Sequence, residues 1–290
     1  MSEDIWSQWL LKRRFGGDPQ RMQVALDHLY PVRDKVLSNA NLANGETLLD
    51  VGCGDGLIAF RALEKAQTIK VIFSDISKDL LQHAQNIAQE IGVLDRCHFL
   101  LASADDLSAL DDASVDIVTT RSVMIFVSAK QQAFNEFYRV LKPKGCLSIF
   151  EPINQFAHST RLPHTFLGYD VTPVLEIAQK LRDVYQRLQP PKTDPMLDFN
   201  ERDLIAFTEK AGFREIHLEL QAEVRPPAEG DWKAFLRTAG NPKIPTLEEA
   251  IQQALTHDEA EKLISHLRPL VESKQGTSRL AVAYLWAIKS

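Results

Sequence analysis

The sequence has few cysteines and no segment typical of a membrane, metal or nucleic-acid protein. Its three cysteines, Cys53, Cys97 and Cys146, have neither metal-site spacing nor a pairing pattern, so we expect reduced thiols and no metal. There is no apolar run of about 18 residues and no signal-peptide pattern, which predicts a cytoplasmic protein that does not use the membrane. With a net charge of −6 and no long basic run, a nucleic-acid partner is not expected either.

The composition is that of an ordinary globular protein. Apolar residues make up 44% of the 290 residues and charged residues 25%, which is enough apolar material for a sizeable core. This length suits one large domain, or a domain with additions, and we find no internal repeat or low-complexity segment. We expect a monomer or a homodimer.

A glycine-rich turn organises the rest of the chain. Residues 47–51 form a short apolar run typical of a strand buried on both faces. Gly52, Gly54 and Gly56 follow, and residues 57–64 then predict a helix. Strand, glycine turn and helix together are typical of nucleotide binding, because glycines allow tight dihedrals and the close approach of a ligand.

An acidic residue ends the next predicted strand. Residues 70–74 are apolar and lead to Asp75, where a carboxylate can accept hydrogen bonds from both hydroxyls of a ribose. The alternative is a simple tight turn beside a surface aspartate. The glycine turn and Asp75 would bind neighbouring parts of one adenosine-type ligand, and this combination favours nucleotide binding.

The spacing of the glycines decides which nucleotide is expected. Dinucleotide sites carry GxGxxG, whereas this chain has GxGxG within LLDVGCGDG. That stretch resembles the first motif of the class I S-adenosylmethionine (SAM) dependent methyltransferases. The resemblance runs from about residue 47 to 152 and resumes from 199 to 224, with four motifs in order. It includes RVLKPKGCLSIFEP, which is similar to the LKPGG segment of the family and the strand after it.

This resemblance implies an α/β fold and SAM as the methyl donor. The expected architecture is a Rossmann-like, seven-stranded, mostly parallel sheet with helices on both faces, an antiparallel last strand and helical cap insertions. The remaining strands are predicted at 97–101, 115–120, 146–150, 213–224 and 278–288. The implied cofactor is SAM, and the residues expected to bind it are Asp50, Gly52, Cys53, Gly54, Asp75, Ile76, Ser103, Ala104, Asp105 and Thr120.

The adenine contact departs from the family pattern. SADDL stands where the family often has GDAEDL, so the adenine-contacting aspartate of the family falls on Ser103. Ser103 can still hydrogen-bond the adenine amine, and the Ala104 N–H can face the ring. Asp105 is a competing partner.

Residues 1–45 form an N-terminal helical extension. Trp6, Trp9 and Leu10 share one helical face, and Lys12–Arg14 follow. Further helices are predicted at 20–30 and 31–40, the second beginning at a proline. The extension is expected to be a lid, with Phe15, Arg13 or Arg14 reaching the ligand; a structural cap or a membrane-surface helix are the alternatives.

The expected core comprises residues 46–153, 199–225 and 277–290. Helical insertions at 154–198 and 226–276 are expected to wall an acceptor pocket. The predicted substrate-binding residues are Arg121, Tyr169 and Trp232. Arg121 ends a buried strand, where an arginine binds either an anionic ligand or a structural carboxylate, for which Glu151 is a candidate.

The predicted reaction is methyl transfer by in-line displacement to a small-molecule acceptor. Such chemistry needs binding and alignment more than reactive side chains. A hydroxyl acceptor would need a general base, for which Glu151, His158 and His164 are candidates, while the catalytic residue itself stays unassigned. O-, N- and C-methylation all remain open. The competing functions are a nicotinamide-dependent oxidoreductase and a non-catalytic SAM-binding or partner-binding module.

Overall fold

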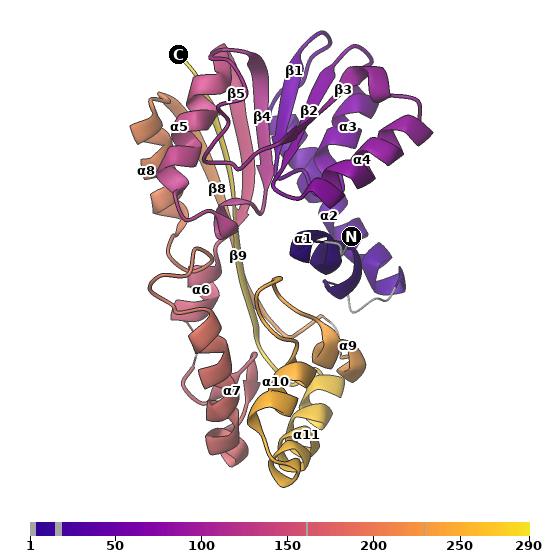
Figure 1. Ribbon diagram of the computed structural model, residues 1–290. Helices are drawn as coiled ribbons and strands as arrows, with labels where there is room; N and C mark the ends of the chain where they lie inside the picture. The colour runs from indigo at the N-terminus through magenta and orange to yellow at the C-terminus, as the bar shows by residue number, and fades with distance from the viewer. Residues whose placement is uncertain (1–3, 15–18, 161, 229) are drawn as a thin grey trace.

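The computed structural model describes residues 4–14, 19–160, 162–228 and 230–290, and is built around a seven-stranded sheet of order β3-β2-β1-β4-β5-β9-β8 (Figure 1). Neighbouring strands are parallel, except that β9 is antiparallel to both β5 and β8. The expected fold class is confirmed. The strands are β1 (Thr47–Val51), β2 (Lys70–Asp75), β3 (Cys97–Leu101), β4 (Val115–Arg121), β5 (Leu141–Pro152), β8 (Glu215–Arg225) and β9 (Ser278–Ile288).

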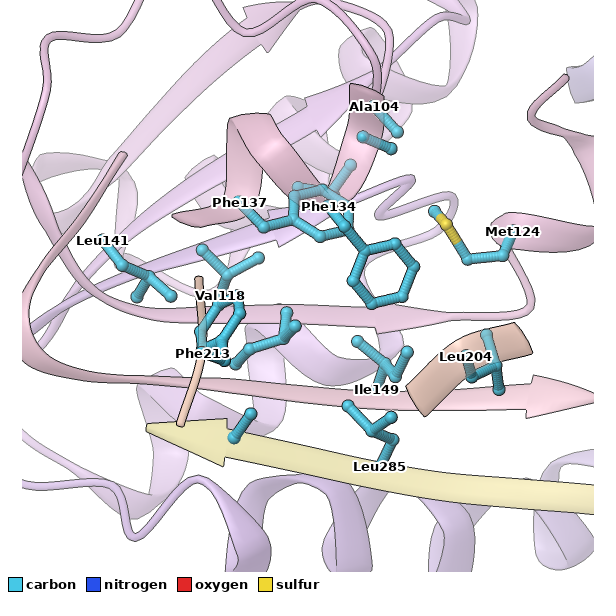
Figure 2. Close-up of a cluster of buried hydrophobic side chains, with 14 of the residues drawn as sticks. Ala104, Val118, Met124, Phe134, Phe137, Leu141, Ile149, Leu204, Phe213 and Leu285 are labelled. Atoms are coloured by element: carbon cyan, nitrogen blue, oxygen red, sulfur yellow. The ribbon is translucent and has the colours of Figure 1, made fainter. Parts of the chain in front are cut away.

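Helices cover both faces of the sheet because its central strands are apolar on both sides. Successive strand residues point to opposite faces, so Leu48 joins one core and Leu49 the other. The helices α2 (Pro19–Asn39), α3 (Leu57–Lys65) and α4 (Lys78–Glu90) pack on the Leu48 side, and α5 (Lys130–Val140) and α8 (Glu201–Ala211) on the Leu49 side. Figure 2 shows Phe134 and Phe137 of α5 in the Leu49-side core with Val118, Ile149 and Leu285.

Two predicted elements differ from the structure by more than two residues at an end. The helices expected at 20–30 and 31–40 are one helix, α2, with Pro31 inside it. Proline removes one backbone hydrogen bond, and the burial of Val36 and Leu37 in the core favours continuing the helix. Strand β5 is longer than expected: its register with β4 jumps from Leu141 to Cys146, so residues 142–145 bulge out of the pairing.

The two insertions form one helical lobe. They contain α6 (Asn154–Ser159), the short strands β6 (Thr165–Phe166) and β7 (Tyr169–Asp170), the turn η4 (Thr172–Val174), α7 (Leu175–Leu188), α9 (Trp232–Arg237), α10 (Leu247–Ala254) and α11 (His257–Glu272). Phe166 and Leu181 from the first insertion share a buried core with Leu247 and Leu263 from the second. Figure 1 shows the helices α7 and α9–α11 below the sheet, beyond the carboxyl ends of its parallel strands.

The N-terminal segment lies between the sheet and this lobe. It consists of α1 (Ile5–Gln8) and a π-helical turn, η1 (Trp9–Arg13), and Figure 1 shows α1 below the sheet and above α9. Two short 3-10 turns complete the described elements, η2 (Leu94–Arg96) and η3 (Met124–Phe126). None of the helices in the described ranges is both long and apolar enough to cross a membrane.

Candidate active site

The glycine turn after β1 has the backbone conformation that its sequence predicts. Gly52, Gly54 and Gly56 have φ angles of +64°, +56° and +84°, in the left-handed region that favours glycine. A Cβ atom on Gly52 would lie 2.4 Å from the Val123 Cγ2 atom, so this residue also allows the loop after β4 to pack closely. The turn therefore brings bare backbone to the carboxyl edge of the sheet, where strand order reverses between β1 and β4.

Asp75 lies beside this turn at the end of β2. Its Oδ2 atom accepts a hydrogen bond from the Gly54 N–H at 2.9 Å, and its Oδ1 atom accepts one from the Ser77 N–H at 2.8 Å. Burial raises the pKa of Asp75, and these two backbone hydrogen bonds oppose the increase. The Ile76 N–H also contributes to holding the carboxylate, so the side chain is fixed in place. A carboxylate has about four lone-pair sites and can therefore accept further hydrogen bonds from a ligand hydroxyl.

A cavity of about 650 Å³ opens at this edge. Its volume is in the range of small-molecule sites. Eight of the sequence-predicted residues line it, namely Gly52, Gly54, Asp75, Ile76, Ser103, Ala104, Asp105 and Arg121. The structure therefore brings the ends of β1, β2, β3 and β4 to one space, as expected for the carboxyl ends of adjacent parallel strands.

The segment after β3 forms one end of the cavity. The Ser103 hydroxyl donates to Asp105 Oδ1, and Ser103 also forms an isolated bridge with Asp106. Ile76 and Leu80 supply apolar surface to the same cavity. A polar turn facing an apolar wall suits a planar base that carries hydrogen-bonding edges.

Three of the residues predicted to bind the cofactor lie beneath the cavity and do not line it. Asp50 is buried and accepts from the Thr119 hydroxyl at 2.9 Å, and burial raises its pKa to about 7. Cys53 is buried in the core on the Leu48 side, and that burial raises the pKa of its thiol well above the usual value. Thr120 is fully buried and donates to Glu151. These residues support the turn from below.

Glu151 supports the loop after β4. Its Oε1 atom accepts from the Val123 N–H at 2.9 Å and from the Thr120 hydroxyl at 3.4 Å. Its Oε2 atom has no hydrogen-bond partner among the described residues. Complete burial raises the pKa of Glu151 to about 7. In the part of the chain that the structure describes, Glu151 forms no ion pair with Arg121, whose side chain instead lines the cavity. The structure therefore does not support the structural pair considered from the sequence.

The other acceptor-site candidates lie outside the cavity lining. Tyr169 is buried in the core of the lobe, where its ring meets Phe235 edge-on at 5.4 Å, and Trp232 stacks on Phe235 at 5.8 Å. His158 is on α6, and His164 is exposed in the loop that follows. Tyr169 and Trp232 were expected to form pocket walls, but neither lines the cavity, because both rings pack on Phe235 within the lobe.

The N-terminal segment covers the cavity instead. Trp6, Trp9, Leu10 and Arg14 line it, and the Trp6 ring packs edge-on against Phe126 at 5.0 Å. Phe15, also expected to reach the ligand, is outside the described residues.

Hydrogen bonds and ion pairs tie this segment to both sides of the cavity. Ser77 Oγ donates to Asp4 Oδ2 at 2.6 Å on the sheet side. On the lobe side, Trp9 Nε1 donates to the Ala239 carbonyl at 3.0 Å, and Arg13 pairs with Glu249 at 2.7 Å. The segment therefore bridges sheet and lobe across the cavity.

Several residues that line the cavity could not be predicted from the sequence. Met196 comes from the loop before α8, and residues 238–240 from the loop after α9. Neither loop has a periodic pattern or a motif. Phe126 and Asn154 also line the cavity, and their places next to the ends of β4 and β5 were the only signal available.

Solved structures with the same architecture define the class of this fold. A putative sarcosine dimethylglycine methyltransferase from Galdieria sulphuraria aligns over 99% of this chain and 99% of its own, with a TM-score of 0.56 and 14% identity. Such low identity shows the fold alone. The fold is that of the class I SAM-dependent methyltransferases, and SAM is the methyl donor that this class implies.

Sequence comparison gives the family. The model of the ubiE/COQ5 methyltransferase family matches residues 24–223, and the chain belongs to that family. The ubiquinone/menaquinone biosynthesis C-methyltransferase UbiE of Cereibacter sphaeroides is 31% identical over 58% of this chain and 66% of its own length. The protein of the same name from Rickettsia typhi is 26% identical over 72% of this chain and 87% of its own. The chain thus spans slightly under two thirds of the first of these relatives.

Proposed function

We propose that this protein transfers the methyl group of SAM to a small, largely apolar acceptor. The observation that carries the proposal is the single cavity under the N-terminal segment, which joins the Asp75–Gly54 corner to the end of β4. A donor and an acceptor bound in one cavity can meet directly.

The described residues fit SAM at one end of this cavity. Asp75 keeps free lone pairs for the two ribose hydroxyls, and residues 103–105 offer polar groups for the adenine edge. Gly52 and Gly54 line the cavity with bare backbone, beside which the methionine portion can lie. When bound, SAM supplies a methyl group on a positively charged sulfur, which needs no further activation by a metal or a covalent intermediate.

The acceptor end is apolar and aromatic. Trp6, Trp9, Phe126 and Met196 line it, as is usual for pockets that hold small organic molecules. The relatives are named as C-methyltransferases, and we extend this to a carbon acceptor here. Arg121 is the cationic group at the end of β4, and we assign it to an anionic or strongly polar substituent of the acceptor.

Catalysis then depends on alignment. None of the three candidate bases, Glu151, His158 and His164, is among the residues lining the cavity. We infer that the protein holds the two reactants in line and that Trp6 and Trp9 exclude water from the reacting atoms. The cytoplasmic location and the monomeric or homodimeric state expected from the sequence remain predictions. A nicotinamide oxidoreductase is not favoured, since the family and the GxGxG turn both indicate a methyltransferase.

The test is transfer of label from methyl-labelled SAM in a fractionated cell extract. We expect label in the small-molecule fraction; label found only in macromolecules would overturn the assignment of the acceptor, and no transfer at all would overturn the function.

Once the acceptor is known, Arg121→Met should raise its KM by about 10- to 100-fold, the usual effect of losing a charge-assisted hydrogen bond, and leave SAM affinity nearly unchanged. An unchanged acceptor KM would remove Arg121 from the acceptor site.

A further inference from the structure

Two guanidinium groups face the same cavity. Arg14 comes from the N-terminal segment and Arg121 from the end of β4, and they are the cationic side chains among the described residues that line this space. Burial and the neighbouring Arg121 charge lower the pKa of Arg14 to about 10, so the Arg14 guanidinium remains charged near neutral pH. Two positive charges that line one cavity favour the binding of an anion there.

The position of Arg14 is fixed by the fold of the segment. Its N–H donates to the Trp9 carbonyl at 2.8 Å, which closes the π-helical turn. Its guanidinium carbon lies 5.3 Å from the centroid of the Trp9 ring. Trp9 is in turn anchored by its indole N–H on Ala239 and by its contact with Phe126 at 6.2 Å. Arg14 is therefore held in place over the cavity.

Arg14 belongs to the glycine-turn side of the cavity. Asp55, the residue between Gly54 and Gly56, is close enough to raise the pKa of Arg14. One turn earlier in the segment, the Leu10 Cδ2 atom lies 3.1 Å from where a Cβ on Gly54 would be. The segment thus lies directly over the part of the turn that the methionine portion of the donor would cross.

We propose that Arg14 binds the α-carboxylate of SAM, so that the N-terminal segment recognises the donor and closes over it. The inference rests on the proposed function, because it takes SAM as the donor. With adenine at residues 103–105 and ribose at Asp75, the methionine portion extends over Gly54 toward Arg14. A guanidinium can hold a carboxylate through two parallel hydrogen bonds. Arg14 lies outside the family-matched residues 24–223, so this contact belongs to the chain's own N-terminal segment.

The neighbouring arginine provides a matched control. Arg13 is on the same turn but points to the lobe, where it pairs with Glu249 at 2.7 Å. It does not line the cavity. Replacing either arginine by methionine removes one positive charge from the segment, yet only Arg14 would face the ligand.

The experiment measures binding of S-adenosylhomocysteine and of its decarboxylated analogue by calorimetry. Arg14→Met should weaken S-adenosylhomocysteine binding by about 10- to 100-fold and leave the analogue within about twofold of wild type. Arg14→Lys, which keeps the charge, should retain more affinity than Arg14→Met. Arg13→Met should change neither affinity by more than about twofold.

Equal losses for both ligands would assign Arg14 a purely structural role and overturn the inference. Unchanged S-adenosylhomocysteine affinity together with a raised acceptor KM would move Arg14 to the acceptor site, and also overturn it. Wild-type protein tests the inference without any variant: a ratio near one between its affinities for the two ligands contradicts it. If wild-type protein binds neither ligand, the proposed function itself fails.

Discussion

Two buried carboxyl groups, Asp50 and Glu151, hold the loops that shape the cavity. Asp50 accepts from Thr119 beneath the glycine turn, and Glu151 accepts from the Val123 N–H beneath the loop after β4. Because Val123 packs against Gly52, the two loops are held together through these side chains. The cost is a carboxyl in a dry environment, which raises the pKa of each group to about 7.

These pKa values predict a pH-dependent stability. A carboxyl whose pKa is higher in the folded protein binds more protons there than in the unfolded chain. The free energy of unfolding therefore falls as pH rises from the ordinary pKa of 4.5 to the folded value of about 7, and then levels off. Glu151→Gln should reduce this fall by about 2 to 4 kcal/mol, measured by urea unfolding at about pH 5 and about pH 8.

The control for this prediction is Glu64→Gln, because Glu64 is an exposed glutamate paired with Arg61 on α3. It should leave the pH dependence as in wild type. If Glu151→Gln also leaves it as in wild type, Glu151 does not titrate near pH 7 in the folded protein.

At the scale of elements, the N-terminal segment stands out because it contacts both the sheet and the lobe. Asp4 is bound at Ser77 and Asp79 at the start of α4, while Arg13 reaches Glu249 on α10. Between these contacts the tryptophan face covers the cavity. A short helix held by a few polar contacts at its ends can open at low cost, as lids over active sites do.

We therefore expect amide hydrogen exchange in residues 5–14 to slow when SAM or S-adenosylhomocysteine is added. The ligand adds contacts to Trp6, Trp9 and Arg14 that the free protein lacks. Mass spectrometry of peptic peptides gives the measurement, with α7 of the lobe as an internal reference that should not change. Equal exchange with and without ligand would make the segment a structural cap.

At the scale of the whole molecule, the sheet and the helical character of the two insertions could be predicted from sequence, whereas the packing of the lobe could not. The bounds of β1, β3 and β9 agree with the predicted ones, because apolar runs between glycine and polar turns specify buried strands locally. The positions of Gly54 and Asp75 in one corner follow from the order of parallel strands. In the lobe, Tyr169 and Trp232 could serve equally as pocket walls or as core. The packing of one insertion on the other decides whether these rings face a pocket or the core. A short stretch of sequence does not specify that packing.

The Asp75–Gly54 corner is the expected binding place of the donor, and calorimetry with SAM tests this most directly. Asp75→Ala should weaken SAM binding by about 2 to 3 kcal/mol, since it removes charge-assisted hydrogen bonds to the ribose. Asp95→Ala, at an exposed site in η2, should bind as wild type does. NAD is expected not to bind. Unchanged SAM affinity in a folded Asp75→Ala variant would contradict this binding place.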